Sequence, residues 1–388
     1  MTTMFNLDHA STAPLNKEAK KAVQEFLSSP IYNPDSAYAP AVELRRYLAD
    51  LKSKTAKLLG TKAPNIFITN GSSDASAKLL NLITSAAPKG SVIATNIEHS
   101  SLLDLVEKLP NAKTLKVDPK KMIDLTKLKS LITDSTTLIT IQYVNNETGQ
   151  ILPIKEISRL VKRIKADRLK RNIRLPLFLH TDASQAAITQ DLLIPRLGVD
   201  SMSLNGSKFG ALPGSGILYL SADLLRWLNS TGVEPETSKE NALSIISLYH
   251  ALRHTIEKKN SEAKRLLNLS QSFYQELQKQ IPEVSLNPCN LKIGKNHSAH
   301  ILNLYIPGIN AERLVILAGL NNIFISTGAA CSASKDKPSH VLEALDLSPK
   351  QIQSSIRVSF GSANKSEQEV KEAAKKLAAL CKSPSIKP

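Results

Sequence analysis

The sequence predicts an α/β protein with a mostly parallel central sheet flanked by helices, followed by a smaller α+β region. Short apolar runs alternate with helical patterns over roughly the first 250 residues, and strand–helix–strand order favours a parallel sheet. The runs show little polar alternation, which is typical of strands covered on both faces. Beyond about residue 250, one long helical pattern precedes more widely separated strand-like runs.

Six apolar runs are the expected strands of the central sheet. They are Asn65–Thr69, Ser91–Thr95, Leu138–Val144, Leu177–His180, Ser201–Leu204 and Gly216–Leu220. Helical spacing of apolar residues predicts the helices between them. These are Ser76–Thr84, Ser100–Leu109, Ile154–Arg171 and Ala222–Leu228.

The second region begins with a long helix near residues 245–281, because Leu266, Phe273 and Leu277 fall on one helical stripe. Strand-like runs follow at His300–Ile306, Ile323–Ser326 and Ser355–Phe360. Ser366 precedes Glu369 by three residues, so we expect the last helix to open with a capping box. We therefore predict a large domain of residues 14–250 and a small domain formed by residues 1–13 and 251–388.

Length and composition exclude several classes of protein. The chain has 388 residues, of which 42% are hydrophobic and 22% charged, as in ordinary globular proteins. Three cysteines are too few for a disulfide-dense secreted scaffold. The first residues lack the pattern of a signal peptide, and no apolar run reaches the ~18 residues of a membrane span. We expect a cytoplasmic protein without a membrane segment.

Lys and Arg outnumber Asp and Glu by 50 to 34, which gives a net charge of +16. Much of this charge lies in residues 155–174, a predicted basic helix. We interpret it as a solvated face; contact with RNA or an acidic scaffold is the alternative. No direct contact with nucleic acid is expected.

Ligands of open α/β sheets bind beyond the carboxyl ends of the strands, so the residues that follow each strand are candidates. Gly71 permits a tight turn, and Ser72 and Ser73 begin a helix, which together favour a phosphate. Ordinary helix caps are the alternative. His99 follows the next strand, where a capping or core histidine is equally compatible. Asn146 lies in a segment that turn chemistry alone would explain.

Two further strand ends carry Asp182 and Lys208. A lysine held in a partly apolar site can act as a nucleophile, and a carboxylate in a crevice needs a cationic partner. This pair suits pyridoxal 5′-phosphate (PLP): the lysine would form a Schiff base, and the carboxylate would keep the pyridine nitrogen protonated.

The second region offers one thiol and one buried cation. Cys331 lies in a small, polar segment, so we expect it to be exposed rather than an inert core residue. Arg357 lies in a strand of apolar and small residues. Because a guanidinium stays charged, it needs an anion, either a ligand carboxylate or a structural salt bridge.

Taken in order, these segments resemble the NifS/IscS-like cysteine desulfurases of the class V aminotransferase family. The resemblance runs over nearly the whole chain, from Asn6–Pro14 to the last helix. Its most specific segments are Val144–Gly149, His180–Gln185, the Cys331 segment and Ser355–Arg357.

The resemblance implies a fold-type I PLP enzyme, normally a homodimer. Lys208 would be the lysine that binds PLP, with His99 stacked on the ring and assisting proton transfer. Asp182 would hold the pyridine nitrogen, and Gln185 and Asn146 would contact the ring hydroxyl and the substrate. The remaining roles would fall to Ser72, Ser73 and Asn205 at the phosphate, Arg357 at the substrate carboxylate and Cys331 as the nucleophile that forms a persulfide.

Three positions depart from the family pattern. Ser207 stands where the family usually has His, and Asn205 stands where it usually has Ser; we keep both as expected cofactor-binding residues. The segment 231–243 lacks the family's Gly-rich stretch and its Arg-x-Gly-Thr, whose Thr reaches the phosphate of the neighbouring subunit.

The implied activity is conversion of L-cysteine to L-alanine, with sulfur retained on Cys331 as a persulfide. The sulfur would then pass to an acceptor protein of iron–sulfur cluster assembly or tRNA thiolation. The alternatives are another class V PLP lyase, such as a selenocysteine lyase, and a degenerate PLP-fold scaffold protein.

Overall fold

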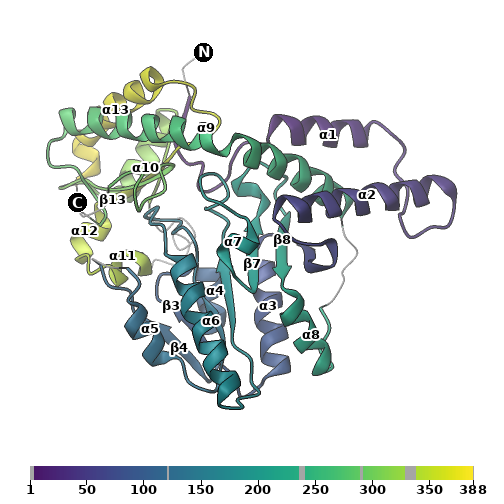
Figure 1. Cartoon of the computed structure of the whole chain (residues 1–388). Helices are drawn as coiled ribbons and strands as arrows, with labels where there is room; N and C mark the ends of the chain where they lie inside the picture. The colour runs from purple at the N-terminus through teal and green to yellow at the C-terminus, as the bar shows by residue number, and fades with distance from the viewer. Residues whose placement is uncertain (1–3, 120–121, 236–240, 289–291, 328–337, 388) are drawn as a thin grey trace.

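The computed structural model describes residues 4–119, 122–235, 241–288, 292–327 and 338–387 (Figure 1). A seven-stranded sheet of order β2-β8-β7-β6-β5-β3-β4 forms the centre of the large region. Its strands are β2 (Ile66–Thr69), β3 (Ser91–Thr95), β4 (Ala112–Leu115), β5 (Thr136–Thr140), β6 (Phe178–Asp182), β7 (Ser201–Asn205) and β8 (Gly216–Leu220). β8 runs antiparallel to β2 and β7, and the other pairings are parallel, which confirms the predicted sheet.

Helices cover both faces of this sheet (Figure 1). One apolar layer packs α3, α4 and α8 against the strands, and the other packs α1, α2 and α6. The helices of the large region are α1 (Lys17–Leu27), α2 (Ala39–Leu58), α3 (Ser72–Ala86), α4 (Ser100–Val106), α5 (Leu125–Leu131), α6 (Ile154–Lys170), α7 (Ile194–Leu197) and α8 (Ala222–Ser230). The sheet is therefore buried between two apolar layers.

The small region packs on the C-terminal half of a long helix, α9 (Ala242–Gln280). The helix α13 (Glu367–Cys381) packs against α9. Its sheet has the order β12-β13-β10-β9 and is antiparallel. The other elements are β9 (Ser285–Leu286), β10 (Ile301–Tyr305), α10 (Ala311–Leu320), β12 (Ser326–Thr327), α11 (His340–Ala344), α12 (Pro349–Gln353) and β13 (Ser355–Ser359).

The amino terminus belongs to the small region's apolar core. β1 (Phe5–Asn6) pairs in parallel with β11 (Ile323–Phe324), and Phe5 shares a buried cluster with Phe273 and Phe360. The predicted boundary between the domains at residue 250 stays a prediction, and α9 runs across it without a break.

The structure corrects three local predictions. The strand expected at 138–144 is β5, which covers Thr136–Thr140: two buried threonines extend it backwards, and the buried residues 141–144 lie beyond its end. The strand expected at 323–326 is two strands, β11 and β12, that join different sheets. The capping box is half formed: Ser366 Oγ accepts from the amide of Glu369 at 3.2 Å, whereas the Glu369 carboxylate accepts from the amide of Lys365 at 2.8 Å.

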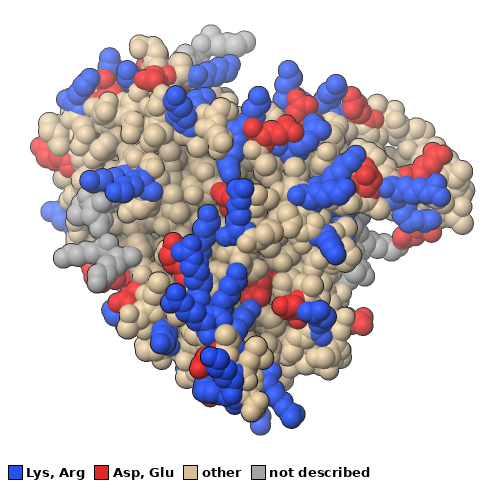
Figure 2. Space-filling view, viewed as in Figure 1, with Lys and Arg blue, Asp and Glu red and all other residues tan. Residues whose placement is uncertain are grey.

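The basic segment 155–174 is largely α6, and Figure 2 shows Lys and Arg gathered in a band over this helix. Some of these cations serve the fold. Lys165 pairs with Asp200 at 2.8 Å, and buried Arg168 donates to the carbonyl oxygens of Thr133 and Leu175. The interpretation of the remaining cations as a solvated face stays a prediction. Among the described residues, no helix is both long enough and apolar enough to span a membrane.

A fully buried carboxyl group lies where β3 and β5 end. Glu98 has an exposed fraction of 0%, accepts from the Thr95 hydroxyl at 2.6 Å, and accepts from the amide of Gln142 at 3.0 and 3.1 Å. Burial, reinforced by the charge of Asp182, raises the pKa of Glu98 to about 8. The carboxyl group is therefore mostly protonated at neutral pH and joins two strand ends as a neutral group.

This protonation predicts a pH-dependent stability. Because the pKa of Glu98 rises from 4.5 to about 8 on folding, its favourable contribution is complete below pH 4.5 and is lost as the pH rises to 8. Between pH 5 and 8, the titration of Glu98 should lower the free energy of unfolding of the wild type by on the order of 4 kcal/mol, and Glu98→Gln should lack this decrease. Urea unfolding at both pH values measures it.

The matched control is Glu107→Gln, which makes the same replacement at an exposed residue at the end of α4. It should leave the pH dependence of the free energy of unfolding as in the wild type. Equal pH dependence in Glu98→Gln and the wild type would contradict a neutral Glu98.

Candidate functional site

A cavity of about 270 Å³ opens at the carboxyl ends of the central strands and reaches the small region. Nine of the residues predicted from the sequence line it together. They are Ser72, Ser73, His99, Asn146, Asp182, Gln185, Asn205, Lys208 and Arg357. Residues far apart in the sequence thus meet in one place, as the strand-end argument requires.

One end of the cavity is an anion cradle. Gly71 has φ = +118°, a backbone conformation that favours glycine, and directly precedes α3. A Cβ on Gly216 would lie 2.5 Å from the Cα of Gly71. Glycine at position 216 therefore allows β8 to approach the turn at Gly71 closely. The first backbone N–H groups of α3, with Ser72 and Asn205, suit a phosphate.

Ser207 does not line the cavity. Its hydroxyl and its backbone amide both donate to Asn205 Oδ1, at 2.9 and 3.1 Å. Ser207 therefore orients Asn205 in this structure, and its predicted contact with the cofactor stays a prediction.

The middle of the cavity carries an acid and a base. Asp182 Oδ1 accepts from the amide and the hydroxyl of Ser184 at 2.9 and 2.6 Å, which fixes the carboxylate at the end of β6. Lys208 Nζ donates to the Ser11 carbonyl oxygen at 2.6 Å. Burial lowers the pKa of His99; the charge of Asp182 opposes this shift, and that of Lys208 adds to it.

Two hydrogen bonds fix the orientation of the Gln185 side chain. Its amide nitrogen donates to the Ala10 carbonyl oxygen at 2.9 Å, and Oε1 lies 3.3 Å from His300 Nε2. Burial lowers the pKa of His300 to about 3, so the ring is neutral and Nε2 donates to Gln185.

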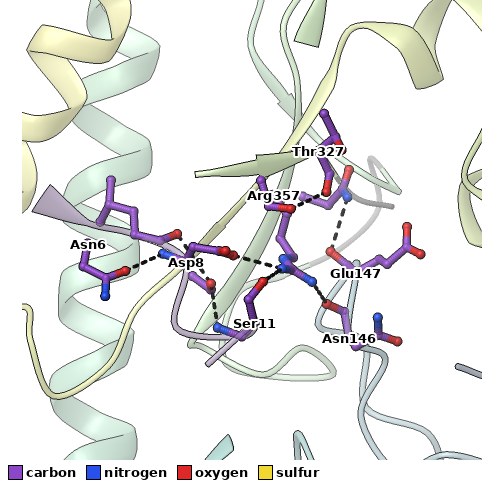
Figure 3. Close-up of polar contacts among 12 residues, drawn as sticks. Asn6, Asp8, Ser11, Asn146, Glu147, Thr327 and Arg357 are labelled. Atoms are coloured by element: carbon purple, nitrogen blue, oxygen red, sulfur yellow. Dashed lines mark hydrogen bonds and ion pairs between the residues drawn. The ribbon is translucent and has the colours of Figure 1, made fainter. Parts of the chain in front are cut away.

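Arg357 on β13 closes the small-region side (Figure 3). Nη2 donates to Asp8 at 2.9 Å and to the Ser11 hydroxyl at 2.7 Å, and Nη1 donates to the Asn146 carbonyl oxygen at 2.9 Å. The side chain is 4% exposed. Two buried polar atoms, Arg357 Nε and Asn146 Oδ1, have no partner among the described residues, and such atoms normally meet a ligand or water.

Two further residues, Glu147 and His340, line the cavity although the sequence did not point to them. Glu147 is buried there, which raises the pKa of its carboxyl group, and it accepts from the Ser339 hydroxyl at 2.5 Å. His340 lines the cavity and donates from Nε2 to the Glu98 carbonyl oxygen at 2.9 Å. Ser339 caps α11, and this capping serine before an apolar helix was the available signal. Cys331 lies outside the described residues.

The donor set of this cavity fits PLP. The cradle at α3 suits the phosphate, Asp182 suits a protonated pyridine nitrogen, and Lys208 supplies the amine that would bind the aldehyde carbon. Asn146 and Arg357 line the same cavity beside these groups. The described residues thus offer groups suited to the phosphate, the pyridine nitrogen and the aldehyde of the cofactor.

Comparisons with known proteins show the family to which the chain belongs. The model of the class V aminotransferase family matches residues 5–372. A protein of Dictyoglomus turgidum named "Cysteine desulfurase IscS" is 31% identical over 92% of this chain and 89% of its own length. A protein of the same name from Methanosarcina thermophila is 29% identical over 93% of this chain and 88% of its own.

Solved structures share the fold. A NifS-like protein superposes with a TM-score of 0.84 at 22% identity, over 97% of this chain and 99% of that one. A NifS-like protein from Rickettsia africae gives a TM-score of 0.80 at 21% identity, over 97% and 100%. The mostly parallel sheet with a small α+β region is therefore the architecture of fold-type I PLP enzymes, and the chain belongs to the class V aminotransferase family, within its NifS/IscS-like group.

Proposed function

We propose that this protein is a PLP-dependent L-cysteine desulfurase that releases L-alanine and retains the sulfur on Cys331 as a persulfide. The observation that carries the proposal is one cavity that holds Lys208, Asp182 and Arg357 together beside an anion cradle. Relatives named cysteine desulfurases, aligned over most of the chain, support the choice of substrate.

Arg357 would bind the substrate carboxylate. Its guanidinium is buried and lines the same cavity as Lys208 and Asp182. Asp8, Ser11 and the Asn146 carbonyl accept hydrogen bonds from the group, so its orientation is fixed before substrate arrives. Such preorganisation lowers the free-energy cost of placing the substrate for reaction.

The cofactor, when bound, supplies an electron sink for the pair left when the substrate Cα–H bond breaks. Lys208 would accept that proton, since its amine lies in the same cavity as Arg357, which would bind the substrate carboxylate. Asp182, fixed by Ser184, would hold the positive charge on the ring nitrogen. His99, neutral because burial lowers its pKa, would exchange protons with the substrate thiol.

Sulfur transfer requires a second thiol in its ionised form. The thiolate of Cys331 would attack the substrate sulfur: an S–S bond forms, the Cβ–S bond breaks, and its electron pair remains on the three-carbon product, which is protonated to alanine. L-Cysteine and one enzyme thiol thus give L-alanine and one enzyme persulfide, with no outside oxidant or reductant. The persulfide sulfur would pass to an acceptor protein of iron–sulfur cluster assembly or tRNA thiolation.

We also propose a homodimer in which α1 and α2 contribute to the interface. The outer end of this helix pair extends from the body (Figure 1), and large apolar side chains are exposed on the two helices and on the segment that joins them, namely Leu27, Ile31, Tyr38 and Tyr47. Exposed apolar groups concentrated on one arm are typical of a protein contact.

Replacing the nucleophile should abolish sulfur transfer. With PLP and a reductant, we expect Cys331→Ser to lower alanine formation from L-cysteine by more than about 100-fold, because no thiolate remains to take the sulfur. Intact-mass spectrometry without reductant should show one added sulfur atom on the wild type and none on the variant.

Cys381→Ser is the matched control. Burial raises the pKa of Cys381 to about 12, so this thiol is not ionised at neutral pH, and its replacement should leave alanine formation and the added sulfur in place. Equal rates in Cys331→Ser and the wild type would contradict the role of Cys331. L-Selenocysteine, assayed beside L-cysteine, separates a desulfurase from a selenocysteine lyase.

Replacing Arg357 should mainly weaken the binding of the substrate. Arg357→Lys keeps the charge but loses the planar donor fork, so we expect KM for L-cysteine to rise by about 10-fold or more. Steady-state kinetics measure it, with Arg226→Lys on the exposed face of α8 as the control. An unchanged KM in Arg357→Lys would place the substrate carboxylate elsewhere.

A further inference from the structure

A short hydrogen-bonded chain runs from the phosphate cradle to His99. The Ser73 hydroxyl donates to Ser101 Oγ at 3.0 Å, and Ser101 Oγ lies 2.8 Å from His99 Nδ1. Because Ser101 Oγ already accepts a proton from Ser73, its own proton is available to His99. The backbone amide of Ser101 also donates to Nδ1, at 3.3 Å, and an N–H group can only donate.

Both contacts identify Nδ1 as an acceptor, so the proton of the neutral ring lies on Nε2. We propose that Ser101 is a positioning residue that holds His99 in this tautomer, and that Ser73 aligns the Ser101 hydroxyl for that role. The consequence for catalysis rests on the proposed function: His99 then offers a proton donor at Nε2, and removal of the substrate Cα proton is left to Lys208.

The local sequence explains why the chain forms here. His99 is the N-cap of α4 and turns its ring back over the first turn of that helix, where Ser101 is the second residue. α3 packs against α4 and begins with Ser72, so Ser73 meets Ser101 across the two helix starts. Two helix N-termini side by side therefore bring their hydroxyl groups together.

The groups that face His99 set the direction of the expected effect. Asp182 on β6 favours the protonated ring, whereas Lys208 after β7, His340 on α11 and Arg357 on β13 oppose it. The Ser73 and Ser101 hydroxyls both point their protons along the chain toward Nδ1, so protonation of Nδ1 would force the Ser101 hydroxyl to turn away and accept instead. The chain as observed therefore further favours the neutral ring. Losing the Ser101 hydroxyl should therefore raise the pKa of His99.

The test measures the pKa of His99 in the full chain without added PLP. Hydrogen–deuterium exchange at the imidazole C2 position, followed by mass spectrometry over a pH series, reports this value. The tryptic peptide 90–108 has His99 as its single histidine. We expect Ser101→Ala to raise the pKa by about one unit, the scale of one hydrogen bond, and Ser101→Thr to keep the wild-type value.

Two further variants make the result specific. Ser73→Ala should shift the pKa of His99 in the same direction but less, because the Ser101 hydroxyl remains. Ser130→Ala, an exposed serine on α5, should leave the pKa unchanged. A wild-type pKa in Ser101→Ala, or a lowered one, would overturn the proposal.

An activity measurement separates this inference from the proposed function. If the wild type forms alanine, the acid limb of its kcat profile should move to higher pH in Ser101→Ala and not in Ser101→Thr; an unmoved limb in Ser101→Ala would contradict the proposal. If the wild type forms no alanine, the proposed function fails, and the pKa of His99 still decides whether Ser101 controls the ring.

Discussion

The buried charge of Arg357 is the constraint on which the meeting of the two regions depends. A guanidinium cannot be neutralised at physiological pH, so a 4% exposed one must be surrounded by acceptors. Asp8 and Ser11 come from the amino terminus, and the Asn146 carbonyl comes from the loop after β5. The chain segments that supply these acceptors are thereby brought to the floor of the cavity.

The same requirement explains why the amino terminus lies with the carboxyl-terminal region. The amide of Ser359, at the end of the strand that carries Arg357, donates to the Leu7 carbonyl oxygen at 2.7 Å. Phe5 and Leu7 then complete an apolar core whose other members come mostly from residues beyond 260. A polar contact in the cavity and an apolar contact in the core thus fix the same segment from two sides.

Strand-end chemistry could be read from the sequence because it follows from sheet geometry. Asp182 and Lys208 follow neighbouring parallel strands, so their meeting depends only on the order of β6 and β7. Glu147 lies in the segment Val144–Gly149, but its contact with Ser339 could not be predicted this way, and neither could that of His340 with Glu98, because each contact joins segments far apart in the sequence. The orientation of Ser207 could not be predicted either, because its hydroxyl can either donate to Asn205, as it does here, or face the cavity.

The central claim is that this cavity binds PLP through Lys208, and a chemical trap tests it most directly. Incubation with PLP, reduction with borohydride and peptide mass spectrometry reveal which lysine carries the cofactor, because reduction makes the imine bond permanent. The structure predicts one reduced PLP group, attached to Lys208, in the wild type. In Lys208→Arg, the peptide that contains position 208 should carry none. An adduct on another lysine with Lys208 unmodified, or no adduct at all, would contradict the account.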